Sequence, residues 1–124
     1  MNSNRIEATV AEIMSSLPRG VTLVAAAKTR TVEEVQAAIR GGAKILGYNY
    51  VQEAERMHQA IGDKVQWHLI GHLQSNKVKK AVRLFALIET IDSWKIAELL
   101  DRQCAAEGKI MPVLVEINSG KESN

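Results

Sequence analysis

The feature that most constrains the fold is a regular alternation of short apolar runs with amphipathic stretches. Apolar runs start near residues 22, 44, 65, 85 and 111, and the first four are followed by residues at helical spacing. Apolar strands separated by helices predict right-handed crossovers and a parallel sheet. The spacing fits a (β/α)₈ barrel of the TIM type, of which about five βα units and an N-terminal helix are present. A doubly wound five-strand sheet is the alternative.

Cap and stop signals define the predicted helices. Thr31 and Glu34 form a capping box before the second helix, and Gly41-Gly42 ends it. Asp92 and Ser93 cap the last helix. The predicted helices cover residues 3–17, 31–40, 50–61, 76–84 and 94–106, and the predicted strands cover residues 22–28, 44–48, 65–70, 85–91 and 111–117.

Composition limits the classes of protein to which the chain can belong. The 124 residues are 46% hydrophobic and 24% charged, which predicts one globular domain over residues 1–124. A net charge of +2 gives little reason to expect a nucleic-acid partner. The single cysteine, Cys104, excludes an intrachain disulfide and fits a reducing compartment. Without a hydrophobic leader or an apolar run of about 20 residues, we expect a cytoplasmic protein that does not span a membrane.

Lys28 is the main candidate for chemistry, because it ends the first apolar run. Strand alternation places it on one face with Val24 and Ala26. Ligands bind at the C-terminal strand edge in both candidate folds, and a partly buried amine there can attack a carbonyl. A lysine that simply reaches solvent is the plainer interpretation. Polar residues also follow the second, third and fifth runs at the same relative place, namely Asn49, His72 and Asn118.

The other polar groups carry weaker signals. Residues 71–80 combine a glycine, capping groups and three lysines, which suits either an anion at a helix N-terminus or a capped surface helix. His58 is predicted on an exposed helix face. His68, Glu89 and Glu116 are predicted as hydrogen-bonded interior groups. The sequence contains no metal-ligand spacing and no GxGxxG, P-loop or GxSxG motif.

Four blocks together resemble a known family. They lie in the right order and spacing, and they read Ala25-Ala-Ala-Lys28-Thr, Gly47-Tyr-Asn-Tyr-Val-Gln-Glu53, Trp67-His-Leu-Ile-Gly-His-Leu-Gln-Ser-Asn-Lys77 and Glu116-Ile-Asn-Ser-Gly120. The chain resembles the pyridoxal phosphate homeostasis proteins, which share a barrel with the alanine racemase N-terminal domain. The resemblance implies a cytoplasmic barrel that binds pyridoxal 5'-phosphate (PLP), supports vitamin B6 and amino-acid balance, and has no robust catalytic activity. It implies a Schiff base through Lys28, with Asn49 close to the cofactor and the 71–77 loop at the border of the pocket.

The chain departs from the family pattern at two points. Tyr48 stands where the family usually has glutamate. Because Tyr48 lies on the opposite strand face from Asn49, we expect the difference to affect packing before it affects PLP binding. Family members are also longer, and their later strands supply the phosphate-binding groups and an arginine at the pyridine nitrogen. We therefore expect a barrel truncated on its C-terminal side that binds PLP weakly by itself. Its unpaired sheet edges would favour self-association or pairing with a C-terminal half.

Three other functions remain open from the sequence. A PLP-dependent amino-acid racemase is the leading alternative, and it requires a second acid or base opposite the lysine. A cofactor-free lyase would use Lys28 alone. A nucleic-acid module based on Lys77–Lys80 is the least favoured, because no series of aromatic residues accompanies the lysines.

Overall fold

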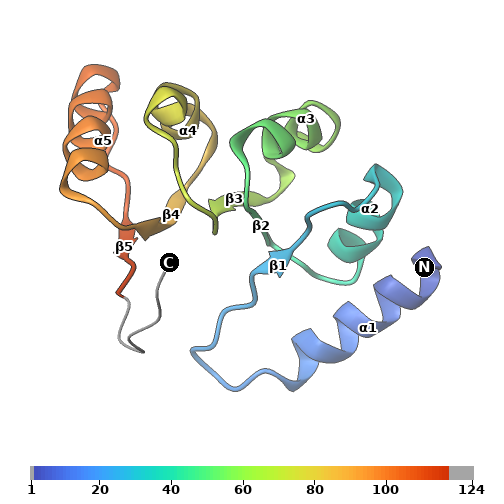
Figure 1. The fold of residues 1–124 in the computed structure, drawn as a ribbon. Coiled ribbons are helices and arrows are strands. Elements are labelled where there is room, and N and C mark those ends of the chain that lie inside the picture. Colours follow the sequence, from blue (N-terminus) through green and yellow to red (C-terminus); the bar gives the residue numbers. More distant parts are fainter. Residues whose placement is uncertain (1, 118–124) are drawn as a thin grey trace.

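The protein forms one parallel sheet, seen in a computed structural model that describes residues 2–117 (Figure 1). The strand order is β1-β2-β3-β4-β5, and each neighbouring pair is parallel. The strands are β1 (Ala25–Ala26), β2 (Ile45–Tyr48), β3 (Gln66–Leu69), β4 (Leu87–Ile91) and β5 (Val113–Val115).

The helices form one layer along one side of this sheet (Figure 1). They are α1 (Ser3–Ser16), α2 (Val32–Arg40), α3 (Val51–Ile61), α4 (Val78–Leu84) and α5 (Trp94–Glu107), with short 3₁₀ turns η1 (Gly62–Lys64) and η2 (Ser75–Lys77). Each helix contacts the next one along the chain. A doubly wound sheet would carry helices on both faces and reverse its strand order, so the prediction of a barrel-type arrangement is confirmed. No helix within residues 2–117 is long and apolar enough to cross a membrane.

The predicted caps set the helix boundaries. Thr31 accepts a hydrogen bond from the backbone N–H of Glu34, and the Glu34 carboxylate accepts one from the backbone N–H of Thr31. The second of these bonds, from the Thr31 backbone N–H to the carboxylate, is the largest cause of a lowered pKa at Glu34. Ser93 caps α5, and Gly108 ends it in the left-handed conformation, with φ of 64°.

The core lies between the three central strands and the helix layer. Tyr48, Trp67 and Leu69 point to the helix side and are fully or almost fully buried. The Tyr48 and Trp67 rings stack with centroids 5.8 Å apart. Burying aromatic and aliphatic side chains of this size removes much apolar surface from water and accounts for most of the stabilisation of the sheet.

The two outer strands are shorter than predicted. Only Ala25 and Ala26 of the first apolar run pair with β2 in register, although the Ala27 N–H still donates to the Gly47 carbonyl at 3.0 Å. In β5 all three residues are exposed, and a register shift interrupts its pairing with β4. A strand is recognised by its ladder, so apolar composition alone overestimated both lengths.

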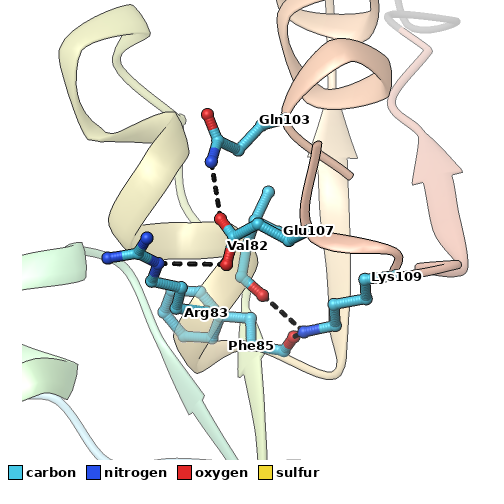
Figure 2. A network of polar contacts seen from close by, with 6 residues as sticks. All are labelled: Val82, Arg83, Phe85, Gln103, Glu107 and Lys109. Atoms are coloured by element: carbon cyan, nitrogen blue, oxygen red, sulfur yellow. Dashed lines mark hydrogen bonds and ion pairs between the residues drawn. The ribbon is translucent and has the colours of Figure 1, made fainter. Parts of the chain in front are cut away.

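Lys109 joins α4 to the end of α5 (Figure 2). Its ammonium group donates to the carbonyl oxygens of Val82 and Phe85, the latter at 2.8 Å. These carbonyls belong to the last turn of α4 and the residue after it, where helices leave acceptors unpaired. Beside this contact, Glu107 accepts hydrogen bonds from Gln103 and from Arg83, the latter at 3.0 Å.

Two local predictions were wrong. The helix predicted from residue 76 begins only at Val78, because the Lys77 N–H bonds to the Gln74 carbonyl in a 3₁₀ turn. His58 is only partly exposed: its side chain is 33% accessible, because its ring packs edge-on against Trp67 with centroids 5.3 Å apart. Its Nε2 lies 2.8 Å from an Asp63 carboxylate oxygen.

Candidate functional site

The candidate residues follow the C-terminal ends of adjacent strands. Lys28 lies two residues after β1, Asn49 directly after β2, and His72 three residues after β3. The register pairs Ala26 with Gly47, so Lys28 and Asn49 each lie two residues beyond paired positions. Because the strands are parallel, these tips share one edge of the sheet. Asn118, the fourth predicted residue, lies outside the described residues.

The strand faces are sorted as predicted. A Cβ atom built on Gly47 would lie 2.9 Å from side-chain atoms of both Val24 and Ile70. These three positions therefore share the face opposite the helix layer. Alternation assigns Asn49 to this same face and Tyr48 to the helix side. The absence of a side chain at Gly47 lets Val24 and Ile70 approach each other across β2.

Lys28 is held by a turn with an unusual backbone. Thr29 has φ of 62°, a left-handed conformation that is uncommon for a residue other than glycine. Its N–H donates to a Glu53 carboxylate oxygen at 2.6 Å, and its hydroxyl donates to the Lys28 carbonyl at 2.6 Å. The Arg30 N–H closes the turn on the Ala27 carbonyl at 3.2 Å. The backbone of Lys28 is thus fixed by α3, which carries Glu53.

Lys28 itself is exposed, which differs from the expected partial burial. Its strand lies at the edge of the described sheet, so β2 provides the only neighbouring strand within residues 2–117. Ala26, on the same face, is also exposed, whereas Ala27 on the helix side is buried. The amine at the C-terminal end of β1 is therefore accessible to a solute, because β1 is a lateral edge strand of the described sheet.

Asn49 and the start of the 71–77 loop lie in close backbone contact. The Ile70 N–H donates to the Tyr48 carbonyl at 2.8 Å, which extends the pairing of β2 with β3. Gly71 follows, and the buried Thr90 on β4 donates its hydroxyl to the Gly71 carbonyl at 2.6 Å. The tips of β2, β3 and β4 are joined in this way.

Two histidine–carboxylate pairs join the β3 segment to the β4 segment. His72 Nδ1 lies 2.9 Å from a carboxylate oxygen of Asp92, which follows β4. Within the strands, His68 Nδ1 lies 3.0 Å from a Glu89 carboxylate oxygen. The prediction of hydrogen-bonded interior groups is confirmed for His68 and Glu89, and it is wrong for Glu116, which is exposed. His72 is exposed at the same edge as Lys28 and Asn49.

Two hollows of the molecule lie away from this edge. One of about 480 Å³ lies between α1, α2 and β1, with Arg5, Arg30 and Glu34 in its wall. Another of about 340 Å³ lies between α5 and β5. Neither is lined by Lys28, Asn49 or His72. Among residues 2–117, no group of three His, Cys, Asp or Glu side chains is arranged to hold a metal ion.

Tyr48 has the packing role that its position predicts. Its side chain is completely buried, and its hydroxyl has no hydrogen-bond partner among residues 2–117. Burial, and then the negative charge of Glu53, raises the pKa of Tyr48 to about 12. The phenol is therefore neutral at physiological pH and faces the helices rather than the strand edge.

Sequence reasoning missed three residues that shape the edge, namely Glu53, Thr90 and Asp92. Glu53 lies inside a block that was singled out, but no local pattern shows that its carboxylate returns to Thr29, 24 positions earlier. Thr90 and Asp92 act across strands on Gly71 and His72. Strand alternation predicts which face a residue occupies but not its cross-strand partner.

A parallel sheet with one helix layer, and with reactive groups at its C-terminal edge, defines a barrel-type βα protein. The family described as "Alanine racemase, N-terminal domain" matches residues 1–122, so the chain belongs to this family. The resemblance stated from the sequence is confirmed.

Curated relatives are named as pyridoxal phosphate homeostasis proteins. The protein from Vibrio alginolyticus is 36% identical over 112 residues, covering 86% of this chain and 48% of the relative. That from Schizosaccharomyces pombe is 39% identical over 108 residues, covering 86% and 46%. The chain therefore spans about half the length of the curated relatives that it matches.

Solved structures agree with the fold. PipY of Synechococcus elongatus PCC7942 with PLP bound superposes with a TM-score of 0.90 at 34% identity, covering 96% of this chain and 57% of that one. Alanine racemase from E. faecalis gives a TM-score of 0.69 at 20% identity, covering 83% and 29%. At that identity the second likeness shows the fold alone.

Proposed function

We propose that this chain binds pyridoxal 5'-phosphate and takes part in vitamin B6 and amino-acid homeostasis, as a cofactor-binding protein rather than an enzyme. The observation that carries the proposal is the exposed Lys28 amine at the C-terminal tip of β1, in a chain that superposes on a PLP-bound relative. Lys28 would hold the cofactor through a Schiff base. Asn49 would contact it, and His72 and Asn118 are the less central candidates.

The residues at the edge fit the aldehyde end of this cofactor. A primary amine condenses with an aldehyde carbon, forming a C=N bond and releasing water. The amide of Asn49 can both donate and accept hydrogen bonds, which suits a ring hydroxyl or a ring nitrogen. PLP supplies an electron-withdrawing ring to amines bound at its aldehyde. The protein's own contribution is to present one accessible amine on a fixed turn.

The phosphate end is expected to be held less well. In the family that the chain resembles, the groups that bind the PLP phosphate come from later strands. This agrees with the phosphate site that many TIM barrels form after strands seven and eight. The candidate residues proposed above, Lys28 and Asn49, serve the aldehyde end and the ring. We therefore propose that the 124-residue chain, measured alone, binds PLP weakly.

The test is a titration of the chain with PLP, followed by borohydride reduction and mass-spectrometric mapping of the modified lysine. We expect a visible absorbance band that saturates only at high PLP concentration, because binding is weak. After reduction we expect a phosphopyridoxyl group on Lys28. Lys28→Ala should abolish both. Lys95→Ala removes an exposed lysine in the first turn of α5 and should change neither. Equal labelling of Lys28 and Lys95 in the unmodified chain would contradict the proposal.

A racemase is the alternative that the same protein can test. Racemisation needs an acid or base on the face opposite the lysine. Amino-acid racemisation that exceeds the Lys28→Ala background would favour an enzyme over a carrier.

We also propose a single domain over residues 1–124, acting in the cytoplasm without nucleic acid or membrane. A second copy or a C-terminal half would cover the exposed lateral edges at β1 and β5. Sedimentation of the chain as a monomer at high concentration would contradict its self-association.

A further inference from the structure

We propose that Gly71, held by Thr90, is a positioning residue that sets the place of Asn49 at the strand edge. This inference rests on the proposed function, because it assigns Asn49 a ligand whose position matters. It adds two residues to the groups that control cofactor binding, Gly71 in the loop after β3 and Thr90 on β4. Neither needs to touch the cofactor.

The contact between Gly71 and Asn49 leaves no room for a side chain. A Cβ atom on Gly71 would lie 2.3 Å from the Asn49 carbonyl oxygen and 2.7 Å from the Asn49 Cα. Both distances are far inside van der Waals contact, and the atoms are backbone atoms that cannot rotate away. Any side chain at position 71 must therefore push the backbone of Asn49, or itself move outward.

Thr90 makes the second alternative costly. Its hydroxyl donates to the Gly71 carbonyl at 2.6 Å, and the side chain is buried on β4. The Ile70 N–H is also bonded to the Tyr48 carbonyl at 2.8 Å. Gly71 is thus held on one side by β4 while its neighbour is held by β2. Displacement is transmitted to Asn49, the first residue after β2.

Gly41 offers a matched control elsewhere in the molecule. A Cβ atom there would lie 2.5 Å from the Glu7 carbonyl oxygen, a comparable backbone clash at the contact of α1 with α2. Gly41 ends α2 and precedes β2, whereas Asn49 follows β2, so the two residues lie at opposite ends of that strand. Gly41→Ala should therefore lower stability without moving the strand edge. Comparing the two variants separates a local effect on Asn49 from a general loss of folding.

The first measurement is PLP affinity in Gly71→Ala, Gly41→Ala and the unmodified chain. A misplacement of about 1 Å in a positioned group can lower the rate of an enzymatic reaction up to a hundredfold. We expect a comparable effect on PLP affinity, which should be roughly tenfold to hundredfold weaker in Gly71→Ala. Gly41→Ala should stay within about twofold, which is less than 0.5 kcal/mol. In an Asn49→Ala background, Gly71→Ala should have little further effect, because the positioned side chain is gone. Full additivity of the two substitutions would overturn the proposal.

The second measurement does not depend on PLP. The backbone and side-chain amide signals of Asn49, followed by NMR without cofactor, should shift in Gly71→Ala and stay in place in Gly41→Ala. Unshifted Asn49 signals in Gly71→Ala would overturn the positioning role even if PLP binds well. If the unmodified chain fails to bind PLP while the signals shift, the proposed function fails and the structural coupling stands.

A milder pair of variants covers the case in which Gly71→Ala does not fold. Thr90→Val removes the hydroxyl that holds the Gly71 carbonyl and keeps the shape of the side chain. Thr90→Ser restores the hydroxyl. The Asn49 signals should shift in Thr90→Val and return in Thr90→Ser. The same position of these signals in both variants would overturn the role of Thr90 and, with it, the proposal.

Discussion

The central strands and the outer strands of this sheet fix their tips by different means. β2, β3 and β4 carry fully buried side chains, and β2 pairs with β3 without interruption from Ile45 to Tyr48. β1 and β5 are short, and β5 is exposed along its length. Asn49 is therefore placed by packing and backbone pairing, whereas Lys28 is placed by a turn bonded to Glu53. A side chain that follows a less packed strand depends on such a local contact to hold its position.

Loss of a central aromatic side chain should have the largest effect on stability. Trp67 is 2% exposed, stacks on Tyr48 and donates its indole N–H to the Gly62 carbonyl at 3.0 Å. Trp67→Ala should lower the free energy of unfolding by about 3–5 kcal/mol, because it leaves a cavity and an unpaired carbonyl. Urea unfolding followed by far-UV circular dichroism measures the change.

Trp94 supplies the matched control for this comparison. It lies at the start of α5, is 79% exposed, and donates to a Glu98 carboxylate oxygen at 2.6 Å. Trp94→Ala should change the free energy of unfolding by less than about 0.5 kcal/mol, as is usual for exposed positions. Similar losses in the two variants would show that the centre and the periphery of the molecule do not differ as described.

Lys109 tests the outer part of the molecule, where a polar contact replaces apolar packing. Lys109→Met keeps the length of the side chain but leaves the Val82 and Phe85 carbonyls without their donor. Leaving buried acceptors unpaired should cost about 1–3 kcal/mol. Hydrogen exchange should show the largest loss of protection in α4 and α5, which is the sharper readout. Lys95→Met, at an exposed position, is the control; equal exchange in both variants would contradict the assignment.

The sequence allowed the order of elements and the position of the candidate residues to be predicted, because both depend on local signals. Each of these signals is contained in a short stretch of sequence. They are the spacing of apolar residues, the Thr31–Glu34 capping box and the helix-ending Gly108. Parallel topology then follows from the crossover rule, and it brings Lys28 and Asn49 to one edge. The family resemblance added the cofactor, which spacing alone leaves open.

What could not be predicted depends on contacts between distant residues. The Thr29–Glu53 bond, the Thr90–Gly71 bond and the close approach of Gly71 to Asn49 each join positions about 20 residues apart. Period and propensity carry no information about such pairs. The exposure of Lys28 was missed for a related reason, since strand alternation reports the face of a residue and not how many strands cover it.

Tyr48 gives the smallest expected effect at neutral pH and the most specific one at high pH. Its buried hydroxyl has no partner within residues 2–117, so Tyr48→Phe removes a desolvated polar group at almost no cost in packing. We expect the free energy of unfolding at pH 7 to be unchanged or raised by up to about 1 kcal/mol. The folded pKa of about 12 lies above the value near 10 of an unfolded tyrosine. Above pH 10 the unfolded chain therefore loses this proton first, and the tyrosine form loses stability until the pH reaches the folded pKa.

The advantage of Tyr48→Phe should accordingly grow between pH 10 and pH 12, by about 1.4 kcal/mol for each pH unit in which only the unfolded phenol is ionised. Urea unfolding at pH 7, 10 and 11 measures it. Tyr50→Phe is the control, because it removes a phenol hydroxyl from an exposed side chain. If the difference between the Tyr48→Phe chain and the unmodified chain stays constant from pH 7 to pH 11, the Tyr48 hydroxyl reaches water or a partner. The centre of the sheet would then be less tightly closed than its packing indicates.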